Sequence, residues 1–407
     1  MKKYLYTFST ALLIAFVLGA CATPNQSSPA KNNVQVQLDQ AQKREANITK
    51  NYQMDSGDNF FTAKITGSNQ PVLHSHELYY QVSVPIGADI NAECFVYHEA
   101  YDTAVSLMRL LDGSLGEMQK TKIHNIDAGT FNDVPYLYQE NMYFTKSRTV
   151  GILKAISIPL DSSLLLCMHD TPGYRNTFKK MASSFARSIN IQHAAKENWQ
   201  REEILVWTLR DMKVGYTSSR AVPDENGDIK NVIETALLIP RSENEALSHD
   251  EYNLTWELPN GELLSGRYSE AENGELKVNV TLNSNEQGAY HVSGLFQGKQ
   301  IDSPLKTRES LDGPFHQQRE MVRAAAPANG QSKPLQINTY VPSMNPLETM
   351  ELNAMPTGEL VDGHPEYEML FLGMKATTVV DGLGSKSMDL EMGPLNIQLS
   401  RAYINER

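Results

Sequence analysis

The sequence predicts an α+β protein with several domains, and three observations support this prediction. The chain has 407 residues, which is more than one hydrophobic core normally serves. Short runs rich in Val, Ile, Thr and Tyr recur along it, and these residues favour strands. Two amphipathic helical patterns interrupt the runs between residues 60 and 195, whereas residues 200–305 contain strand and turn patterns only.

Residues 60–195 have the pattern of one compact α/β domain. Its two expected helices are Tyr101–Leu111 and Thr171–Ile189, and Pro172 stands at the start of the second. The expected order is strand, strand, helix, four strands, helix. This order, closed by the segment Met181-Ala-Ser-Ser-Phe-Ala-Arg-Ser-Ile189, resembles the PsbP-type α/β/α sandwich. The resemblance implies an antiparallel sheet between helices and a binding or assembly role.

Residues 200–305 change character and predict a β-sandwich. Turn sequences containing Asn-Gly end at Gly227, Gly261 and Gly274, with strand-length runs between them. Trp256 in one run and Tyr290 near the start of a later one resemble the core tryptophan and corner tyrosine of immunoglobulin-like domains. The resemblance implies an immunoglobulin-like β-sandwich, although this module has no cysteine pair.

The remaining segments complete the expected organisation. Residues 306–334 predict a linker with a short helix from Pro314 to about Ala326. Residues 335–407 return to strand patterns and predict a β-rich C-terminal domain. These strands either form a third small domain or complete the sheet begun by Ile204–Val214.

The first residues predict a secretory signal and a lipid attachment site. Lys2 and Lys3 precede an apolar run, Ala11–Val17, which is too short to span a bilayer comfortably. The following Leu18-Gly-Ala-Cys21 looks like the lipobox of bacterial lipoproteins. The resemblance implies cleavage of residues 1–20 and attachment of diacylglycerol and an N-acyl chain, such as palmitate, to Cys21.

Several acyl chains on one residue provide stable membrane anchoring. After Cys21 the apolar runs are of strand length, so we expect no transmembrane helix. Residues 21–59 carry few large apolar side chains and predict a flexible tether behind the lipidated cysteine. Ala22, where an Asp favours the inner membrane in lipoproteins of enterobacterial type, favours the outer membrane facing the periplasm, with surface exposure as an alternative.

The formal net charge is −12, which disfavours nucleic acid as a partner because nucleic acids reward clustered Lys and Arg. The expected partners are the lipid bilayer, through the acyl anchor, and an envelope protein or cell-wall component. The sequence contains no Gly-x-Ser-x-Gly elbow, no His-Glu-x-x-His helix and no phosphate-binding Gly-rich loop. We therefore expect a non-enzymatic binding or assembly role without a cofactor.

The two cysteines that remain after lipidation define the main candidate site. Cys94 and His98 lie four apart on one expected strand, and Cys167 and His169 lie two apart on another, so each pair shares one face. An oxidising compartment favours a disulfide between Cys94 and Cys167. The alternatives are two separate buried thiols, or a metal or thiol site that combines these cysteines and histidines.

An enzymatic alternative also remains open at the level of sequence. An envelope hydrolase would have its site in the α/β domain, around His98, His169 and Asp170. This hypothesis requires the three side chains to lie close together, because a catalytic base must reach the group it serves.

Overall fold

The structure is a computed structural model in which residues 41–98, 102–111, 118–145, 150–160, 162–192, 197–285, 287–307, 310–326, 330–371, 374–392 and 395–407 are described. The predicted signal peptide, Cys21 and the tether as far as residue 40 lie outside these ranges. The described residues form two compact units. The N-terminal unit contains those before Glu197 together with Leu238–Ser248, and the C-terminal unit contains Glu197–Leu237 and His249–Arg407.

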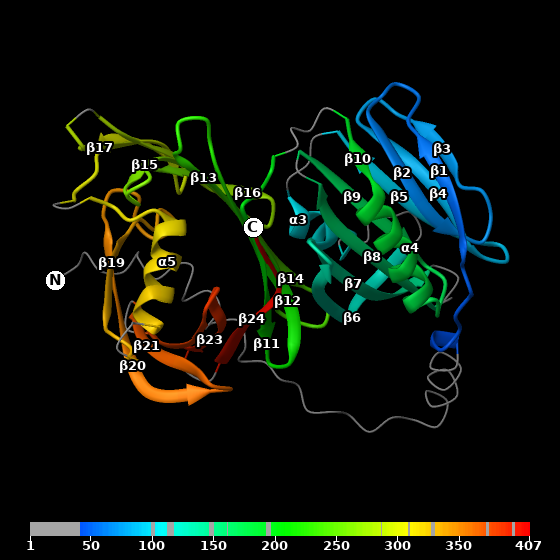
Figure 1. Ribbon diagram of the computed structural model, residues 1–407. Helices are drawn as coiled ribbons and strands as arrows, with labels where there is room; N and C mark the ends of the chain where they lie inside the picture. Colours follow the sequence, from blue (N-terminus) through cyan, green and yellow to red (C-terminus); the bar gives the residue numbers. More distant parts are fainter. Residues whose placement is uncertain are drawn as a thin grey trace. The chain divides into compact units, whose positions relative to one another are not determined.

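Both units are built mainly from antiparallel strands (Figure 1). The predicted α+β class with an α/β/α sandwich is therefore wrong, and the protein is mostly β. Local patterns identified most strands, but they carry no information about which strands pair. Strands that were assigned to different domains in fact belong to one continuous sheet in the C-terminal unit.

The N-terminal unit begins earlier than the sequence predicts. Its three-stranded sheet has the order β1-β2-β10. The strands are β1 (Lys50–Asp55), β2 (Phe61–Gly67) and β10 (Asn190–Ile191). Strand β1 lies inside the segment predicted as a tether, residues 21–59. It is ordered because it pairs with β2 along its whole length and because Met54 is buried in the core.

A seven-stranded antiparallel sheet forms the centre of this unit, in the order β3-β4-β5-β9-β8-β7-β6. Its strands are β3 (Val72–Ser75), β4 (Tyr79–Gly87), β5 (Ile90–Tyr97), β6 (Met118–Phe131), β7 (Val134–Thr145), β8 (Val150–Leu160) and β9 (Ser163–His169). Strand β4 shows how the sequence sets the faces, because its alternate residues Tyr80, Val82, Val84 and Ile86 are buried.

Helices lie on both faces of the seven-stranded sheet. Helix α4 (Arg175–Ser188) and β2 cover one face and share a core with Ile156 and Ile158 of β8. Helix α3 (Thr103–Met108) and the 3-10 turn η1 (Arg109–Leu111) follow β5 in the chain. Ser106 of α3 contacts the hydroxyl of Ser157, which points away from that core. Because the first face also carries a three-stranded sheet and α3 has six residues, the unit is not the predicted sandwich.

One antiparallel sheet of fourteen strands forms the C-terminal unit, apart from Leu238–Pro240 and Ala246–Ser248, which are grouped with the N-terminal unit. Its strand order is β18-β17-β16-β15-β14-β13-β12-β11-β24-β23-β22-β21-β20-β19. In chain order, the first eight strands of this sheet are β11 (Arg201–Leu209), β12 (Met212–Pro223), β13 (Ile229–Pro240), β14 (Ala246–Glu257), β15 (Leu263–Glu272), β16 (Glu275–Ser284), β17 (Tyr290–Phe296) and β18 (Lys299–Pro304). The last six are β19 (Leu335–Thr339), β20 (Met350–Val361), β21 (His364–Phe371), β22 (Met374–Asp381), β23 (Gly384–Met392) and β24 (Leu395–Glu406).

This continuous sheet corrects the prediction for residues 200–305. They do not form an immunoglobulin-like β-sandwich, because each strand from β11 to β18 pairs with the next one in the chain. Trp256 is only half-buried, whereas Tyr290 is buried and donates a hydrogen bond to the carbonyl of Leu263 at 2.7 Å. Strand β24 pairs with β11, so residues 335–407 complete the sheet begun there and are not a third domain.

Helix α5 (Pro314–Ala325) confirms the short helix predicted in the linker. Pro314 begins it, as expected for a residue with a fixed φ and no N–H to satisfy. Its buried residues Met321 and Ala324 share a core with residues of β20, β21 and β22, and the helix packs against β19, β22 and β23. Figure 1 shows α5 enclosed by the curve of the sheet. Irregular pairing in β11, β15 and β22 fits this curvature, because a bulge bends a strand.

Candidate ligand-binding site

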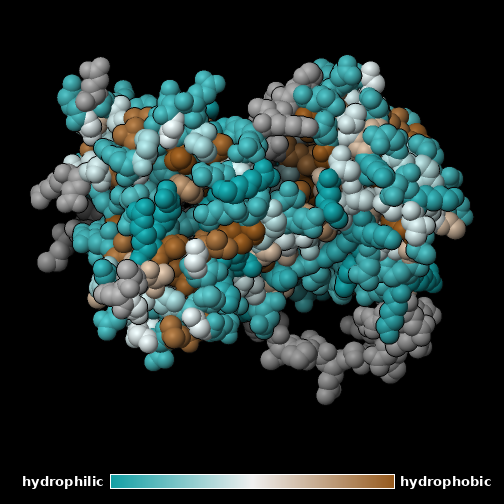
Figure 2. Space-filling model, viewed as in Figure 1, coloured by the Kyte–Doolittle hydropathy of each residue, from teal (hydrophilic) through white to brown (hydrophobic). Residues whose placement is uncertain are grey.

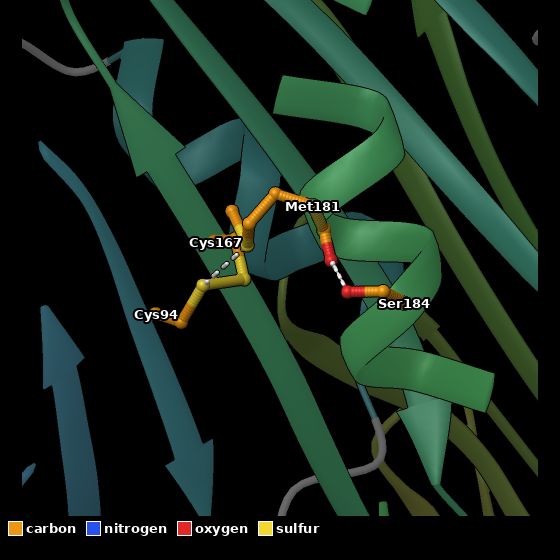
Figure 3. The surroundings of a disulfide bond; sticks show 4 residues. All are labelled: Cys94, Cys167, Met181 and Ser184. Carbon is orange, nitrogen blue, oxygen red and sulfur yellow. Dashed lines mark hydrogen bonds between the residues drawn. A yellow bond between two sulfur atoms is a disulfide. The ribbon is translucent and has the colours of Figure 1, made fainter. Parts of the chain in front are cut away.

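The two cysteines form a buried disulfide at the centre of the N-terminal unit. Cys94 of β5 and Cys167 of β9 are paired directly across the sheet, with their Cα atoms 3.9 Å apart, and both are fully buried. Figure 3 shows Met181 of α4 beside the bond, with its sulfur 3.9 Å from Cys94 Sγ. The predicted disulfide is thus present, and in this state neither thiol is free to bind a metal or act in redox chemistry.

The two histidines predicted beside the cysteines lie at opposite ends of these strands. The antiparallel register pairs Glu93 with Met168, so His169 lies beside position 92, six residues along β5 from His98. At about 3.4 Å per residue this separates them by roughly 20 Å. The structure therefore does not bring His98 together with His169 and Asp170, the arrangement that the hydrolase hypothesis requires.

His98 and His169 each pack against an aromatic ring in the N-terminal unit. The ring of His98 packs against Phe60, with centroids 4.6 Å apart, and the ring of His169 packs against Phe178 at 5.3 Å. Burial, followed by the nearby charge of Lys154, lowers the pKa of His169 to about 3. His169 therefore stays neutral at physiological pH. Asp170 accepts a hydrogen bond from Tyr143 at 3.1 Å.

A buried ionic network in the N-terminal unit gave no signal in the sequence. Arg175, at the start of α4, makes two hydrogen bonds to the fully buried carboxylate of Glu140, at 2.6 and 2.5 Å. Lys154 donates to the carbonyl of Thr171 at 2.8 Å, and burial lowers the pKa of Lys154 to about 8. These groups satisfy one another and hold α4 on the sheet.

A large cavity lies in the C-terminal unit, between α5 and the inner face of the sheet. It has a volume of about 540 Å³ and is here called the α5 cavity. Most of its apolar side chains come from α5 and from strands β19 to β23. They are Phe315, Met321, Ile337, Leu352, Met369, Ala376, Met388 and Leu390. Figure 2 shows hydrophobic side chains in a band beside α5 on the visible face of this unit.

The facing wall of the α5 cavity is more polar. Strands β11, β12 and β13 contribute Arg201, Thr217, Ser219 and Asn231 to it. These residues alternate with residues of the outer face, so strand geometry points them inward together. The cavity therefore has one apolar wall and one wall that offers hydrogen-bonding groups.

The start of α5 is held by a carboxylate from a different element. Glu257 of β14 is buried, and its Oε2 accepts a hydrogen bond from the backbone N–H of His316 at 3.2 Å. Its other oxygen accepts from Asn231 at 3.1 Å. Burial raises the pKa of Glu257 to about 7. Gly313, before the helix, has no room for a Cβ, which would overlap the Glu257 carboxylate.

A second cluster of ionisable groups lies on the same unit, at β14 and β15. One donor atom each of His249, Glu270 and Glu272 lies within 4.8 Å of the others, and an imidazole with two carboxylates is a donor set that metals use. His249 is also 3.7 Å from Glu251 and 3.9 Å from Glu270. Burial opposes the charge on His249, but Glu251 and Glu270 raise its pKa above the ordinary value. The same atoms thus form an ion cluster among themselves.

Sequence reasoning missed the α5 cavity, because its lining comes from segments between residues 201 and 390. No spacing between such distant residues is informative. The pattern of the helix that covers the cavity was the one part of the site that the sequence indicated.

Within the described residues, no helix is both long and apolar enough to cross a membrane.

Comparisons with known proteins do not assign a family. No family model matches the sequence, and no curated protein matches it. Among solved structures, the chain is similar to a β-barrel-like protein of a domain of unknown function (DUF1849) from Brucella abortus. That similarity has 12% identity and a TM-score of 0.38, and it covers 52% of this chain and 99% of that one.

The chain is also similar to a cyanobacterial PsbP from Synechocystis. Here the identity is 15% and the TM-score 0.26, over 36% of this chain and 95% of that one. The neighbours thus include a PsbP protein, in keeping with the predicted resemblance. At these TM-scores neither similarity carries an argument about function.

Proposed function

We propose that this chain is a lipid-anchored envelope protein that binds an apolar ligand in the α5 cavity. The observation that supports binding is the cavity itself. Its volume of about 540 Å³ lies within the roughly 300–1,000 Å³ typical of small-molecule sites, which are also mostly apolar with a few polar groups. Leu18-Gly-Ala-Cys21 supports the anchor.

Binding would follow from burial of apolar surface. A ligand that enters the cavity removes its own apolar surface, and that of Met369, Met388 and Leu390, from water. Each Å² of apolar surface buried contributes about 25 cal/mol, before the cost of immobilising the ligand. The polar groups of β11, β12 and β13 would orient the ligand without supplying most of the affinity.

A binding role is better supported than hydrolysis. The histidines of the hydrolase hypothesis lie at opposite ends of β5 and β9, and the two thiols are joined in a disulfide. Attachment through acylated Cys21 to the outer membrane, facing the periplasm, remains part of the proposal, with surface exposure as the alternative. An envelope protein or cell-wall component would then be within reach as a source or recipient of the ligand.

The binding proposal can be tested with the purified chain lacking residues 1–20 and a neutral fluorescent probe, N-phenyl-1-naphthylamine. We expect saturable fluorescence enhancement by the wild type. Ala376→Phe fills the cavity from β22 and should weaken binding at least about tenfold. Lys375→Phe is the matched control, because Lys375 is the neighbouring residue on the same strand, is exposed and does not line the cavity. Equal binding by both variants would place the probe elsewhere and contradict the proposal.

The anchor requires a separate experiment. Cys21→Ser in the full chain should prevent incorporation of labelled palmitate and release the protein from the membrane fraction. Cys94→Ser serves as the control, since that cysteine is buried in the disulfide and should leave labelling at Cys21 intact. Labelling that persists in Cys21→Ser would refute attachment at this residue.

A further inference from the structure

Four side chains of types that bind metals lie on one face of the β14–β15 hairpin, and they are here called the β14–β15 cluster. The antiparallel register places His249 directly opposite Glu272. It also places Glu251 directly opposite Glu270. Residues two apart on a strand point to the same face, so the four side chains project together. Two like charges directly opposite each other destabilise a strand pair, so this arrangement favours a positive charge between them.

The protein itself supplies little positive charge to the β14–β15 cluster. Among the described residues, the charged groups that act on the carboxylate of Glu270 are His249, Glu251 and Glu272. Burial raises the pKa of Glu270 above its ordinary value, and the charges of Glu251 and Glu272 act in the same direction. Even a protonated His249 leaves two of the three carboxylates without a counter-charge. One divalent cation would supply it, and buried charges in proteins are normally paired or bound to a metal.

The donor atoms of the cluster are close enough together to bind one ion. One such atom each of His249, Glu270 and Glu272 lies within 4.8 Å of the others. Glu270 is 3% exposed, and its Oε1 lies 3.9 Å from His249 Nδ1, which is beyond hydrogen-bond reach. The ligands of a tetrahedral zinc ion at about 2.1 Å are roughly 3.4 Å apart, so the side chains need to close by only about 1 Å.

Two neighbouring groups orient these ligands. The Nε2 atom of His249 faces a carboxylate oxygen of Glu251 at 3.7 Å, so a proton on Nε2 points toward Glu251 and leaves Nδ1 free for a metal. Histidines that bind metals usually donate their other N–H to a carboxylate or carbonyl in this way. Tyr268 in turn donates a hydrogen bond to Oε2 of Glu270 at 3.0 Å, which leaves Oε1 directed at His249.

An ion can reach the cluster from solvent. The side chains of His249 and Glu251 are 13% and 27% exposed. Glu251 and Tyr268 also line a cavity of about 240 Å³ in the C-terminal unit. The cluster thus has a buried carboxylate at its base and an accessible side, which an ion needs in order to enter and exchange.

We propose that His249, Glu270 and Glu272 bind one divalent first-row transition-metal ion such as Zn²⁺, and that Glu251 positions His249. An imidazole nitrogen combined with carboxylate oxygens suits zinc and its neighbours, whereas Mg²⁺ and Ca²⁺ prefer oxygen ligands alone. Three protein ligands leave one position of a tetrahedral ion to water. The site is separate from the α5 cavity and does not depend on the ligand proposed there.

Isothermal titration calorimetry with Zn²⁺ tests the site in the chain that lacks residues 1–20. All proteins carry Cys21→Ser and no affinity tag, because a free cysteine at the new N-terminus would itself bind zinc. We expect one Zn²⁺ per chain with a Kd below about 1 µM. Mg²⁺ and Ca²⁺ should bind at least about a hundredfold more weakly.

Two variants localise the binding. His249→Gln removes the nitrogen ligand and should weaken zinc binding at least about tenfold. Glu272→Gln should do the same, although it also removes one of three repelling charges and should therefore favour folding. His291→Gln is the matched control, because His291 is exposed on β17 and faces a single carboxylate, that of Asp302, at 3.1 Å. It should bind zinc as the wild type does.

Three results would overturn the proposal. They are a wild type that binds no zinc below about 100 µM, equal affinity for Zn²⁺ and Mg²⁺, and wild-type zinc affinity in either folded variant. Circular dichroism establishes which variants fold. The preference of the wild type for zinc and the effect of Glu272→Gln decide the matter even where His249→Gln does not fold. Binding of N-phenyl-1-naphthylamine should be unchanged in both variants, so failure of the metal site leaves the proposed function standing.

Discussion

Glu257 shows how one buried side chain links two distant segments. It lies on β14, yet it accepts hydrogen bonds from Asn231 of β13 and from the backbone at the start of α5. The sequence gives no reason to single it out among 48 acidic residues. Only the folded chain places its carboxylate at the start of α5, where burial raises its pKa to about 7.

This pKa predicts a pH dependence of stability. The folded pKa is higher than the ordinary value of 4.5, so folding favours the protonated form. The contribution is complete below about pH 4.5 and is lost as the pH rises through about 7. Glu257→Gln should remove up to roughly 2–3 kcal/mol of the decrease in the free energy of unfolding between pH 5 and 8.

The measurement is urea unfolding followed by tryptophan fluorescence at several pH values. The three tryptophans, at 199, 207 and 256, all belong to the C-terminal unit and report on it selectively. Glu275→Gln, at an exposed surface pair with Lys277, is the control. A wild-type pH profile that Glu257→Gln leaves unchanged would contradict the assigned protonation.

The disulfide is the second feature at the scale of single residues. It joins residues 73 apart in sequence and constrains the unfolded chain. The double substitution Cys94→Ala and Cys167→Ala should therefore lower the free energy of unfolding of the N-terminal unit by about 2–5 kcal/mol. Circular dichroism would show an earlier transition, while tryptophan fluorescence of the C-terminal unit should not change. The disulfide has no stabilising role if the N-terminal transition does not move.

Among the elements, α5 was predictable and its position was not. Pro314 and the amphipathic pattern that follows identify a helix from the sequence. The position of α5 against the sheet depends on two glycines, and only the structure shows why. A side chain at Gly313 would overlap Glu257, and one at Gly261 would overlap His316.

The substitution Gly313→Ala tests whether this contact sets the position of α5. The added methyl group should push the helix start away from Glu257 and cost about 1–3 kcal/mol of stability in the C-terminal unit. Because α5 forms one side of the cavity, probe affinity should fall as well. Gly382→Ala is the matched control, since a Cβ there meets nothing within 4 Å. Equal stability and affinity in the two variants would show that α5 does not depend on this contact.

Strand patterns were also recognised more easily than their partners. The turns at Gly227, Gly261 and Gly274 each connect successive strands of a hairpin, as predicted. The prediction of an immunoglobulin-like β-sandwich was wrong because hairpin turns occur both in sandwiches and in long meanders, so they do not distinguish the two. The difference lies in whether successive hairpins stay in one sheet, and pairing between neighbours is a tertiary property.

For the whole molecule, the two units have separate cores. The N-terminal core draws on β1, β2, β10, the seven-stranded sheet and α4, and the C-terminal unit has its own clusters around Tyr268 and Tyr367. All residues that line the α5 cavity belong to the C-terminal unit. Its binding activity should therefore be contained in that part of the chain.

We predict that residues 197–407, produced alone, fold and bind N-phenyl-1-naphthylamine with an affinity within about threefold of the full chain. Circular dichroism tests the fold, and a fluorescence titration tests the binding. The fragment 41–196, which contains the N-terminal unit without Leu238–Ser248, is the control and should not bind the probe. Binding by that fragment, or a folded C-terminal fragment without binding, would contradict a site confined to one unit.

The sequence by itself determined local features of this protein: most strands, helix α5 and, as the favoured interpretation, the pairing of Cys94 with Cys167. Processing at Cys21 stays a prediction. The local features follow from periodicity, turn residues and the chemistry of a few side chains, all readable within short windows. The tertiary structure alone decided the mostly β class, the closure of β24 onto β11, the separation of His98 from His169 and the existence of the α5 cavity. Each of these depends on contacts between residues far apart in the chain, and such contacts leave no periodic trace in a single sequence.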